Sequence, residues 1–521
     1  MEINLPTLNR TKRNELVILI LCLLIGFVLR FYTFDRKSLW LDEVYTYNEM
    51  RYGLKDQLNF YQEKPYNIQA PLFFIFTNLF YPSAKPERDL RIIPLICGTL
   101  SISMIYLLSK LFCQKIALPC MFTLTFMAYH ISISQEGRSY SMLMFVGMVA
   151  VYLLLKHLKT SKKRYLFSGA FFYAFMFHIS YSSIPFIIFS QILWLYQIRE
   201  DNEKPKLSLF LIFNGMILFF CLPWLLFLFL NYKGQPIMGV PTPQEAGSFL
   251  NTIFGVFHDW MPNMPLVVLS AVPIILFPFF SNRRNAILLW TIFILPIGAL
   301  HLYCRAFHIY HFMTSRYFIS FLPLFLLLIF LSINAAEDKF QILRKYLRFK
   351  TLFLIFLIAS NLAILPLYYR SEKQDFRGLV HYLRGHLKDG DIIIVSSETY
   401  ILGMLHYFGV YPEGHYYTLP TRTVLGKEKE QLVSLSLDNR KFVIEHSNTY
   451  WSNYFTEGNR LWIVVHKNAV NNVNKIPSIV LKGYFDGSFL NFDRFPMDAS
   501  MYLFLWDPHS PEEKGIDMAL E

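Results

Sequence analysis

The feature that most constrains this chain is a series of long apolar runs separated by short charged clusters. A helical membrane span needs about 20 mostly apolar residues, and about eleven runs come close to that length. The chain is 54% hydrophobic and only 17% charged, which is too apolar for an ordinary soluble protein. We therefore expect a mainly α-helical protein with many transmembrane spans. The expected spans are residues 16–34, 91–110, 116–133, 140–156, 165–181, 183–198, 207–230, 264–281, 286–303, 317–334 and 350–369.

The net charge of +12 comes from Lys and Arg that gather in alternate loops between the apolar runs. Basic loops face the cytoplasm, so the membrane surface, and not nucleic acid, is the expected partner of this charge. The amino terminus is also basic, with Arg10, Lys12 and Arg13. An odd number of spans then places the carboxyl terminus outside the cytoplasm. The protein is expected in the cell membrane.

The chain changes character at about residue 371. The stretch "DFRGLVHYLRGHL" (375–387) has helical spacing, and "DIIIVSS", "KFVIEH", "RLWIVVH" and "MYLFLW" read as short buried strands. We expect two domains: residues 1–370 form the membrane domain, with a first outer loop at 35–90, and residues 371–521 form an extracytoplasmic α/β domain.

An acidic pair, Asp42 and Glu43, lies directly after the first apolar run in "KSLWLDEVYTY". Ionised carboxylates among Trp, Leu, Val and Tyr are costly to desolvate, so the pair needs an explanation. It is either the centre of the chemistry or the start of a surface helix, with Trp40 as an interface anchor.

Two further polar groups share the outer side of the membrane in this topology. "SQEGRSY" between the third and fourth spans contains Glu136 and Arg138, and "TSRYF" opens the tenth span with Arg316. Taken singly, these groups have ordinary explanations as a solvated turn and a membrane-anchoring arginine. Taken together, they predict one cavity at one membrane depth. The candidate residues are Asp42, Glu43 and Glu136 for catalysis, Arg138, Arg316 and Arg91 for phosphate binding, and Tyr140, Tyr317 and Gln135 for lining the donor or acceptor site.

The order of these motifs resembles a known enzyme family. "WLDE" follows the first span, "APLFFIF" and "ERDLRIIPL" precede and open the second, "SQEGRSYS" follows the third, and "SRYFISFLPL" opens the tenth. This arrangement is similar to the dolichyl-phosphate-mannose–protein mannosyltransferase-like family of GT-C glycosyltransferases. The resemblance implies a GT-C membrane fold, a polyprenyl-phosphate sugar as donor, Asp42 as the leading catalytic candidate, and basic residues that hold the donor phosphate.

The resemblance has limits. The related lipid A aminoarabinose transferases carry an Arg three positions after the Asp and a Lys just before the Pro-Leu element, where this chain has Tyr45 and Gln69. The resemblance therefore does not identify the sugar, and the acceptor can be a protein, a lipid or another glycan.

The chemistry explains why these residue types are needed. The phosphate leaving group is already anionic, so the main task is to remove a proton from the acceptor hydroxyl, which a carboxylate such as Asp42 can do. One base on the face opposite the leaving group predicts inversion at the anomeric carbon. The alternative function is a transporter or flippase of lipid-linked saccharides, but such proteins place polar residues in the middle of the membrane and show repeated halves.

No metal site is expected. The histidines His301, His308 and His311 match no zinc spacing, and the six cysteines lie in or beside apolar runs. No metal or other cofactor is predicted beyond the lipid-linked sugar substrate.

Overall fold

The chain forms two compact units, which are described separately. Unit 1 comprises Met1–Phe34, Leu54–Leu79 and Arg91–Pro366, and unit 2 comprises Asp35–Gly53, Phe80–Leu90 and Leu367–Glu521. The chain therefore contributes to unit 2 three times. The computed structural model describes residues 10–63, 65, 68–196, 207–233, 249–306, 315–410, 421–424, 428–437, 439–446, 455, 458–489 and 498–509.

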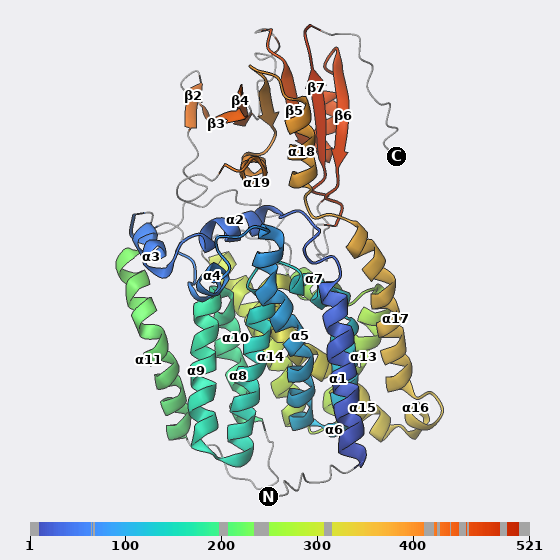
Figure 1. Cartoon of the computed structure of the whole chain (residues 1–521). Coiled ribbons are helices and arrows are strands. Elements are labelled where there is room, and N and C mark those ends of the chain that lie inside the picture. The colour runs from blue at the N-terminus through green and yellow to red at the C-terminus, as the bar shows by residue number, and fades with distance from the viewer. Residues whose placement is uncertain are drawn as a thin grey trace, which may run out of the picture. The chain divides into compact units, whose positions relative to one another are not determined.

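Unit 1 is built of helices (Figure 1). The first residues of α5 and the last residues of α17 are counted in unit 2. The helices are α1 (Arg10–Phe31), α3 (Leu54–Glu63), α4 (Leu72–Asn78), α5 (Pro86–Phe112), α6 (Gln114–Phe126), α7 (Ala128–Ser134), α8 (Tyr140–Thr160), α9 (Lys163–Ile179), η1 (Tyr181–Ser183), α10 (Ile184–Phe189), η2 (Ser190–Leu195), α11 (Leu207–Asn231), α12 (Phe249–Trp260), α13 (Met264–Phe280), α14 (Arg283–Ala306), η3 (Ser315–Phe321), α15 (Leu322–Lys339), α16 (Gln341–Lys345) and α17 (Phe349–Arg370).

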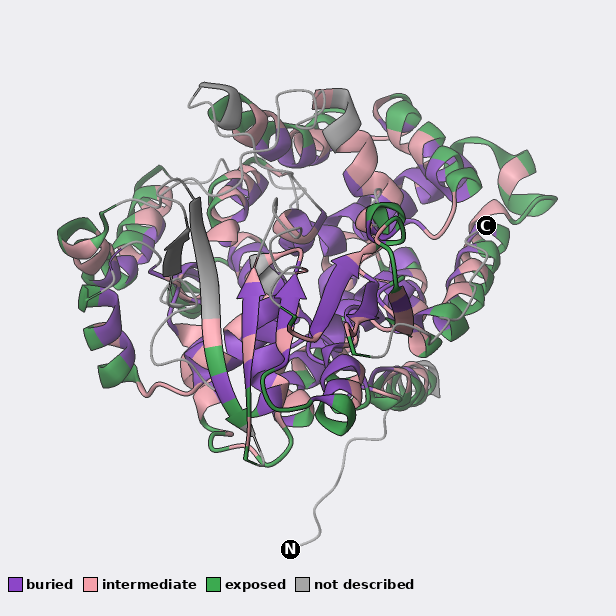
Figure 2. Cartoon of the chain, turned by 90° about the horizontal axis from the view of Figure 1, so that it is seen from above, coloured by how far each residue is buried: buried purple, intermediate pink, exposed green. Residues whose placement is uncertain are grey.

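The helices of unit 1 differ sharply in how far they are buried. In the segment formed by η3 and α15, 89% of the most apolar window is buried, against 17% in α1 and 22% in α11. A helix that is apolar all round and buried lies inside a bundle. The outer helices instead expose large apolar side chains, such as Val28 at 62% and Phe229 at 85%. Figure 2 shows such helices with buried and exposed sides. This apolar outer surface suits lipid chains and identifies unit 1 as a membrane domain.

Fewer spans are recognised than the sequence predicts. Among the described residues, seven helices are long and apolar enough to cross a membrane, or up to nine if each of two bent helix pairs is one span. The predicted count of about eleven is higher because two apolar runs form shorter pieces. Helix α9 has 17 residues, and Tyr181–Leu195 is divided into η1, α10 and η2, with Pro185 at the start of α10 where it cannot donate an N–H.

Unit 2 contains a seven-stranded mixed sheet in the order β2-β3-β4-β1-β5-β7-β6. Strand β1 pairs in parallel with β4 and β5, and the other pairs are antiparallel. The predicted helix and four predicted strands are confirmed, as α18, β1, β4, β5 and β7. The strands are β1 (Ile392–Val395), β2 (Thr421–Val424), β3 (Glu428–Leu437), β4 (Arg440–His446), β5 (Leu461–His466), β6 (Ile479–Phe485) and β7 (Met501–Trp506), and the helices are α2 (Leu41–Met50), α18 (Phe376–His386), α19 (Glu398–Phe408) and α21 (Lys467–Val473).

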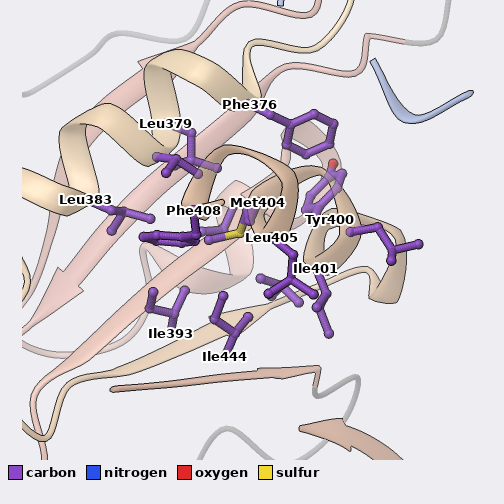
Figure 3. Packing of buried hydrophobic residues seen from close by; sticks show 14 of the residues in the cluster. Phe376, Leu379, Leu383, Ile393, Tyr400, Ile401, Met404, Leu405, Phe408 and Ile444 are labelled. Carbon is purple, nitrogen blue, oxygen red and sulfur yellow. The ribbon is translucent and has the colours of Figure 1, made fainter. Parts of the chain in front are cut away.

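Alternate side chains of each strand point to opposite sides of the sheet. Because the central strands carry apolar residues at successive positions, both faces of the sheet are apolar. On one face, Ile393 and Ile444 belong to a core cluster with residues of α18 and α19, as Figure 3 shows. On the other face, Ile394 and Phe504 pack with Val470 of α21. The first cluster, which we call the α18–α19 core, also contains residues from near the amino terminus: Leu39, Val44, Tyr47, Met50 and Leu90.

Candidate functional site

Helix α2 carries the acidic pair and belongs to unit 2. Its first residue, Leu41, follows Trp40, which has an extended backbone. The Oε2 atom of Glu43 accepts a hydrogen bond from the backbone N–H of Trp40 at 3.4 Å. A carboxylate at this position satisfies a free donor at the start of the helix and complements the helix dipole. Glu43 therefore makes the contact expected if the acidic pair only starts a surface helix. Glu43 is 1% exposed, whereas Asp42 is half-buried.

The segment before α2 lies next to a carboxylate of the C-terminal part of the chain. Oε2 of Glu372 accepts a hydrogen bond from the backbone N–H of Ser38 at 3.0 Å. Burial and the nearby carboxylate of Asp375 raise the pKa of Glu372 to about 7, against the opposite effect of Lys37 and Arg377. The carboxyl group of Glu372 therefore titrates around neutral pH.

The turn between α7 and α8 carries four candidate residues in unit 1. Glu136 is buried, at 2% exposure, and Arg138 is half-buried, with its guanidinium carbon 5.9 Å from the ring centroid of Tyr140. That distance permits a cation–π interaction. The side-chain amide of Gln135 donates to the carbonyls of Arg30 and Tyr32 at 2.8 and 2.6 Å. Gln135 therefore ties the turn to the end of α1.

A fully buried arginine, Arg30, holds the helix break that precedes this turn. Helices α6 and α7 meet at a bend of 59°, which leaves carbonyl groups at the end of α6 without helical partners. Arg30 donates to the carbonyls of Leu124 at 2.8 Å and Thr125 at 3.2 Å. It also lies 2.6 Å from Nδ1 of His130. Because an arginine side chain only donates, Nδ1 accepts, and the imidazole proton is on Nε2.

Helix α17 supports the same break from another side. The side-chain carbonyl of Asn361 accepts a hydrogen bond from the backbone N–H of Ala128, the first residue of α7, at 2.9 Å. The cation Arg30 thus bonds the carbonyl groups at the end of α6, and the amide oxygen of Asn361 bonds an N–H group at the start of α7. This arrangement complements the partial charges of the two helix ends. The break between α6 and α7 is therefore stabilised by specific side-chain hydrogen bonds within unit 1.

Helix α5 approaches the same region closely. Arg91 is buried and donates to the carbonyl of Phe34 at 2.9 Å. A Cβ atom on Gly98 would lie 2.1 Å from Oγ of Ser134 and 2.9 Å from Oγ of Ser141. Only glycine at position 98 lets α5 pack this closely against the residues on both sides of the turn.

The element η3 brings Arg316 and Tyr317 next to α7 and α8. The hydroxyl groups of Tyr129 in α7 and Ser315 in η3 are hydrogen-bonded at 2.9 Å, and η3 contacts α8. Arg316 and Tyr317 are both half-buried. In unit 1 the elements that carry Gln135, Glu136, Arg138, Arg316 and Tyr317 are therefore neighbours, and their sharing of one site stays a prediction. Asp42 and Glu43 belong to unit 2, and their convergence with this group stays a prediction.

The histidine-rich stretch is described only in part. His301 lies in α14, with its ring centroid 5.7 Å from that of Phe249, and His308 and His311 lie outside the described residues. Over the described ranges, no three or more His, Cys, Asp or Glu side chains are placed to hold a metal ion.

Sequence reasoning missed two kinds of residue that support the candidates. Arg30 stands in the first apolar run, and a charge within a span is itself a signal for a functional or structural role. Gln374 and Tyr407, which bond the backbone around the start of α2, carry no such signal, since they lie more than 300 residues away along the chain.

Comparisons with known proteins agree on one class. Residues 69–227 match the family described as "Dolichyl-phosphate-mannose-protein mannosyltransferase". The fold is similar to ArnT from Cupriavidus metallidurans in the apo state, with a TM-score of 0.53 and 10% identity over 95% of this chain and 98% of that one. ArnT from the same organism bound to undecaprenyl phosphate gives a TM-score of 0.51 and 10% identity over 94% and 98%. No curated protein sequence matches the chain.

These findings define the protein as a membrane glycosyltransferase. The family predicted from the order of the sequence motifs is confirmed over residues 69–227, and the fold is similar to that of ArnT.

Proposed function

We propose that the protein transfers a sugar from a polyprenyl-phosphate donor to a hydroxyl group of an acceptor on the extracytoplasmic side of the membrane. The family match over residues 69–227 carries this proposal. It is supported by the ArnT-like fold along almost the whole chain, since one of the similar structures is bound to undecaprenyl phosphate. The acceptor is a protein, a lipid or another envelope glycan.

In the proposed reaction, the acceptor oxygen forms a bond to the anomeric carbon while the bond from that carbon to the phosphate oxygen breaks. The bonding electrons leave with the phosphate, and the proton of the acceptor hydroxyl passes to a carboxylate. Asp42 is the proposed base, because Glu43 already accepts the backbone N–H of Trp40. A positioned base contributes about 10²–10⁴-fold to the rate. Attack opposite to the leaving group inverts the anomeric carbon.

The departing phosphate needs fixed positive charge. Arg138 and Arg316 are the proposed phosphate ligands, because both are half-buried on elements of unit 1 that lie together, and a guanidinium can bind two phosphate oxygens at once. Arg91 is the third choice because it already donates to a backbone carbonyl. Tyr140 and Tyr317 are proposed to line the same site.

A vesicle assay with purified full-length protein tests this function. The probe is a lipid extract from membranes of the source organism, which supplies polyprenyl-phosphate sugars together with lipid acceptors. Release of free polyprenyl phosphate, measured by mass spectrometry, supports transfer. Movement of the intact donor across the vesicle membrane without release contradicts it and favours the transporter.

A topology experiment tests the side of the membrane. A reporter that is active only outside the cytoplasm, fused after Glu521, is expected to be active, and the same reporter fused after Lys163 is expected to be silent. The reverse pattern would place the proposed site on the cytoplasmic side. Comparing envelope glycans from cells with and without the gene would identify the acceptor.

A further inference from the structure

Backbone N–H groups at the start of α2 are bonded by side chains from far along the chain. We call residues Ser38–Leu41 the leading segment of α2. All four of its N–H groups are accepted by side-chain oxygen atoms, and three of these oxygens belong to residues 372–407. The pairs are Ser38 with Glu372 at 3.0 Å, Leu39 with the Tyr407 hydroxyl at 2.7 Å, Trp40 with Glu43 at 3.4 Å and Leu41 with Gln374 at 2.9 Å.

The groups that accept these bonds are themselves fixed. The Tyr407 hydroxyl, which accepts from Leu39, donates to Oε1 of Glu87 at 3.0 Å, and Glu87 also pairs with Arg377 at 3.6 Å. Gln374 is 8% exposed, and it directly precedes Asp375, which caps α18 by accepting the N–H of Gly378 at 2.8 Å. These acceptors are therefore held by the fold of unit 2, which includes Glu87.

Apolar contacts hold the rest of α2 in the same unit. Val44, Tyr47 and Met50 lie in the α18–α19 core. The rings of Tyr47 and His406 meet edge to face with centroids 4.9 Å apart, and burial lowers the pKa of His406 to about 4, so a neutral ring faces Tyr47. A helix of ten residues is too short to be stable alone. Its position and the direction of its side chains therefore depend on these contacts.

We propose that Gln374 and Tyr407 are positioning residues for sugar transfer, and that the C-terminal α/β unit serves to hold α2 so that Asp42 keeps a fixed place. This inference rests on the proposed function, in which Asp42 is the base. Gln374 bonds the residue directly before Asp42, and Tyr407 bonds the residue three positions before it. A small displacement of a catalytic group can cost about 10²-fold in rate. Losing these bonds should therefore slow turnover without weakening donor binding.

The test compares variants of the full-length protein in detergent. Gln374→Leu and Tyr407→Phe each remove one acceptor and keep most of the side-chain volume. Gln374→Glu keeps an oxygen at the same reach and serves as the rescuing variant. Tyr502→Phe is the matched control, because Tyr502 is buried in the same unit but packs on the other face of the sheet.

We expect the Gln374→Leu/Tyr407→Phe double variant to lower kcat by about tenfold or more, with each single variant in between. Binding of undecaprenyl phosphate, used as the probe, should stay within about twofold, because this probe lacks the reacting sugar and acceptor. Hydrogen exchange of the peptide around residues 38–41 should speed up in the same variants. Gln374→Glu should restore most of the turnover, and Tyr502→Phe should match the parent.

Two results would overturn the inference: a double variant that turns over within about twofold of the parent, or an equal loss in Tyr502→Phe, which would indicate general damage to the unit. Asp42→Asn, measured in parallel, separates this failure from failure of the proposed function. Full turnover by Asp42→Asn would refute Asp42 as the base, while the exchange measurement would still show whether Gln374 and Tyr407 hold α2.

Discussion

Helix α2 in unit 2 and the α7–α8 turn in unit 1 both carry candidate residues, but opposite kinds of hydrogen bond hold them. Beside the turn, the cation Arg30 donates to carbonyl groups at the broken end of α6. Before α2, side-chain oxygens such as those of Gln374 and Tyr407 accept from backbone N–H groups. In each case the side chains complement the helix end that they contact. Carbonyl groups lack helical partners at the end of a helix, and N–H groups lack them at its start.

The two regions differ in their supporting contacts because one lies in an apolar helix bundle and the other in an α/β unit. In an apolar bundle every free carbonyl must find a donor within the protein, and one guanidinium carries five N–H donors. A single residue can therefore satisfy several carbonyl groups at the end of α6. Support of α2 is divided among several acceptors and an apolar core, so the loss of one contact should matter less there than the loss of Arg30 matters in unit 1.

The largest expected effect concerns the chemistry of α2. Asp42→Asn keeps the size of the side chain but cannot take the acceptor proton, so turnover should fall by about two orders of magnitude or more. Glu43→Gln keeps an acceptor for the Trp40 N–H and should be milder. Steady-state kinetics of folded protein provide the measurement. Near-normal turnover by Asp42→Asn would make α2 a structural helix and Glu136 the next candidate base.

The next effect tests the contribution of Arg30 to the break between α6 and α7. Arg30→Met should lower stability by roughly 1.5–3 kcal/mol, because it leaves several buried carbonyls without a charged donor. Thermal unfolding in detergent measures this loss. Arg30→Lys should recover only part of it, since one ammonium cannot reproduce the fork of the guanidinium. Arg164→Met, at an exposed arginine of α9, is the control. Equal stability of Arg30→Met and the parent would contradict the view that Arg30 holds the break.

A smaller effect is expected for the proposed phosphate ligands. Arg138→Ala and Arg316→Ala should each weaken binding of undecaprenyl phosphate by about tenfold, because one charge-assisted contact is lost. The turn itself should remain folded, since Arg30 and Gln135 are unchanged. Titration of the probe into purified protein gives the affinity. Unchanged affinity in both variants would identify these arginines as membrane-interface anchors.

The last expected effect is a pH dependence in unit 2. The pKa of Glu372 is raised to about 7 from its ordinary value of 4.5, so between these values the folded protein binds more protons than the unfolded chain. Stability from this group is therefore present at the lower pH and is lost as pH rises toward 7, by at most about 1.4 kcal/mol per pH unit. Glu372→Gln should flatten the fall of Tm between about pH 5 and 7. A parent profile that already lacks this fall would contradict the prediction.

The sequence predicts those helices and strands that a local pattern of apolar residues marks. Apolar runs mark the long helices, and the short runs at 392–395 and 501–506 mark strands of the sheet. Strand β3 was not predicted, because "EKEQLVSLSL" is polar over its first half. Division of the run around Pro185 into short helices was not predicted either, since hydropathy measures composition and not helix continuity.

The proposed site residues of unit 1 carry a signal in the sequence, because Glu136, Arg138 and Arg316 are charged groups beside apolar runs. The supports of α2 do not. Nothing in the local sequence of Gln374 or Tyr407 indicates a partner near residue 40, because such pairs are set by the fold of the whole chain. The inclusion of residues 35–53 in the C-terminal unit has the same origin.

The threefold contribution of the chain to unit 2 has a consequence for synthesis. Helix α2 is made early, but the core that receives it includes Met501, Leu503 and Leu505 of β7, near the end of the chain. At typical synthesis rates of 5–20 residues per second, α2 must wait on the order of a minute for these partners. A chain cut short before β7 would have its membrane helices but would lack part of the core that holds α2. If Asp42 is the base, as proposed, sugar transfer would then begin only after the whole polypeptide has been made.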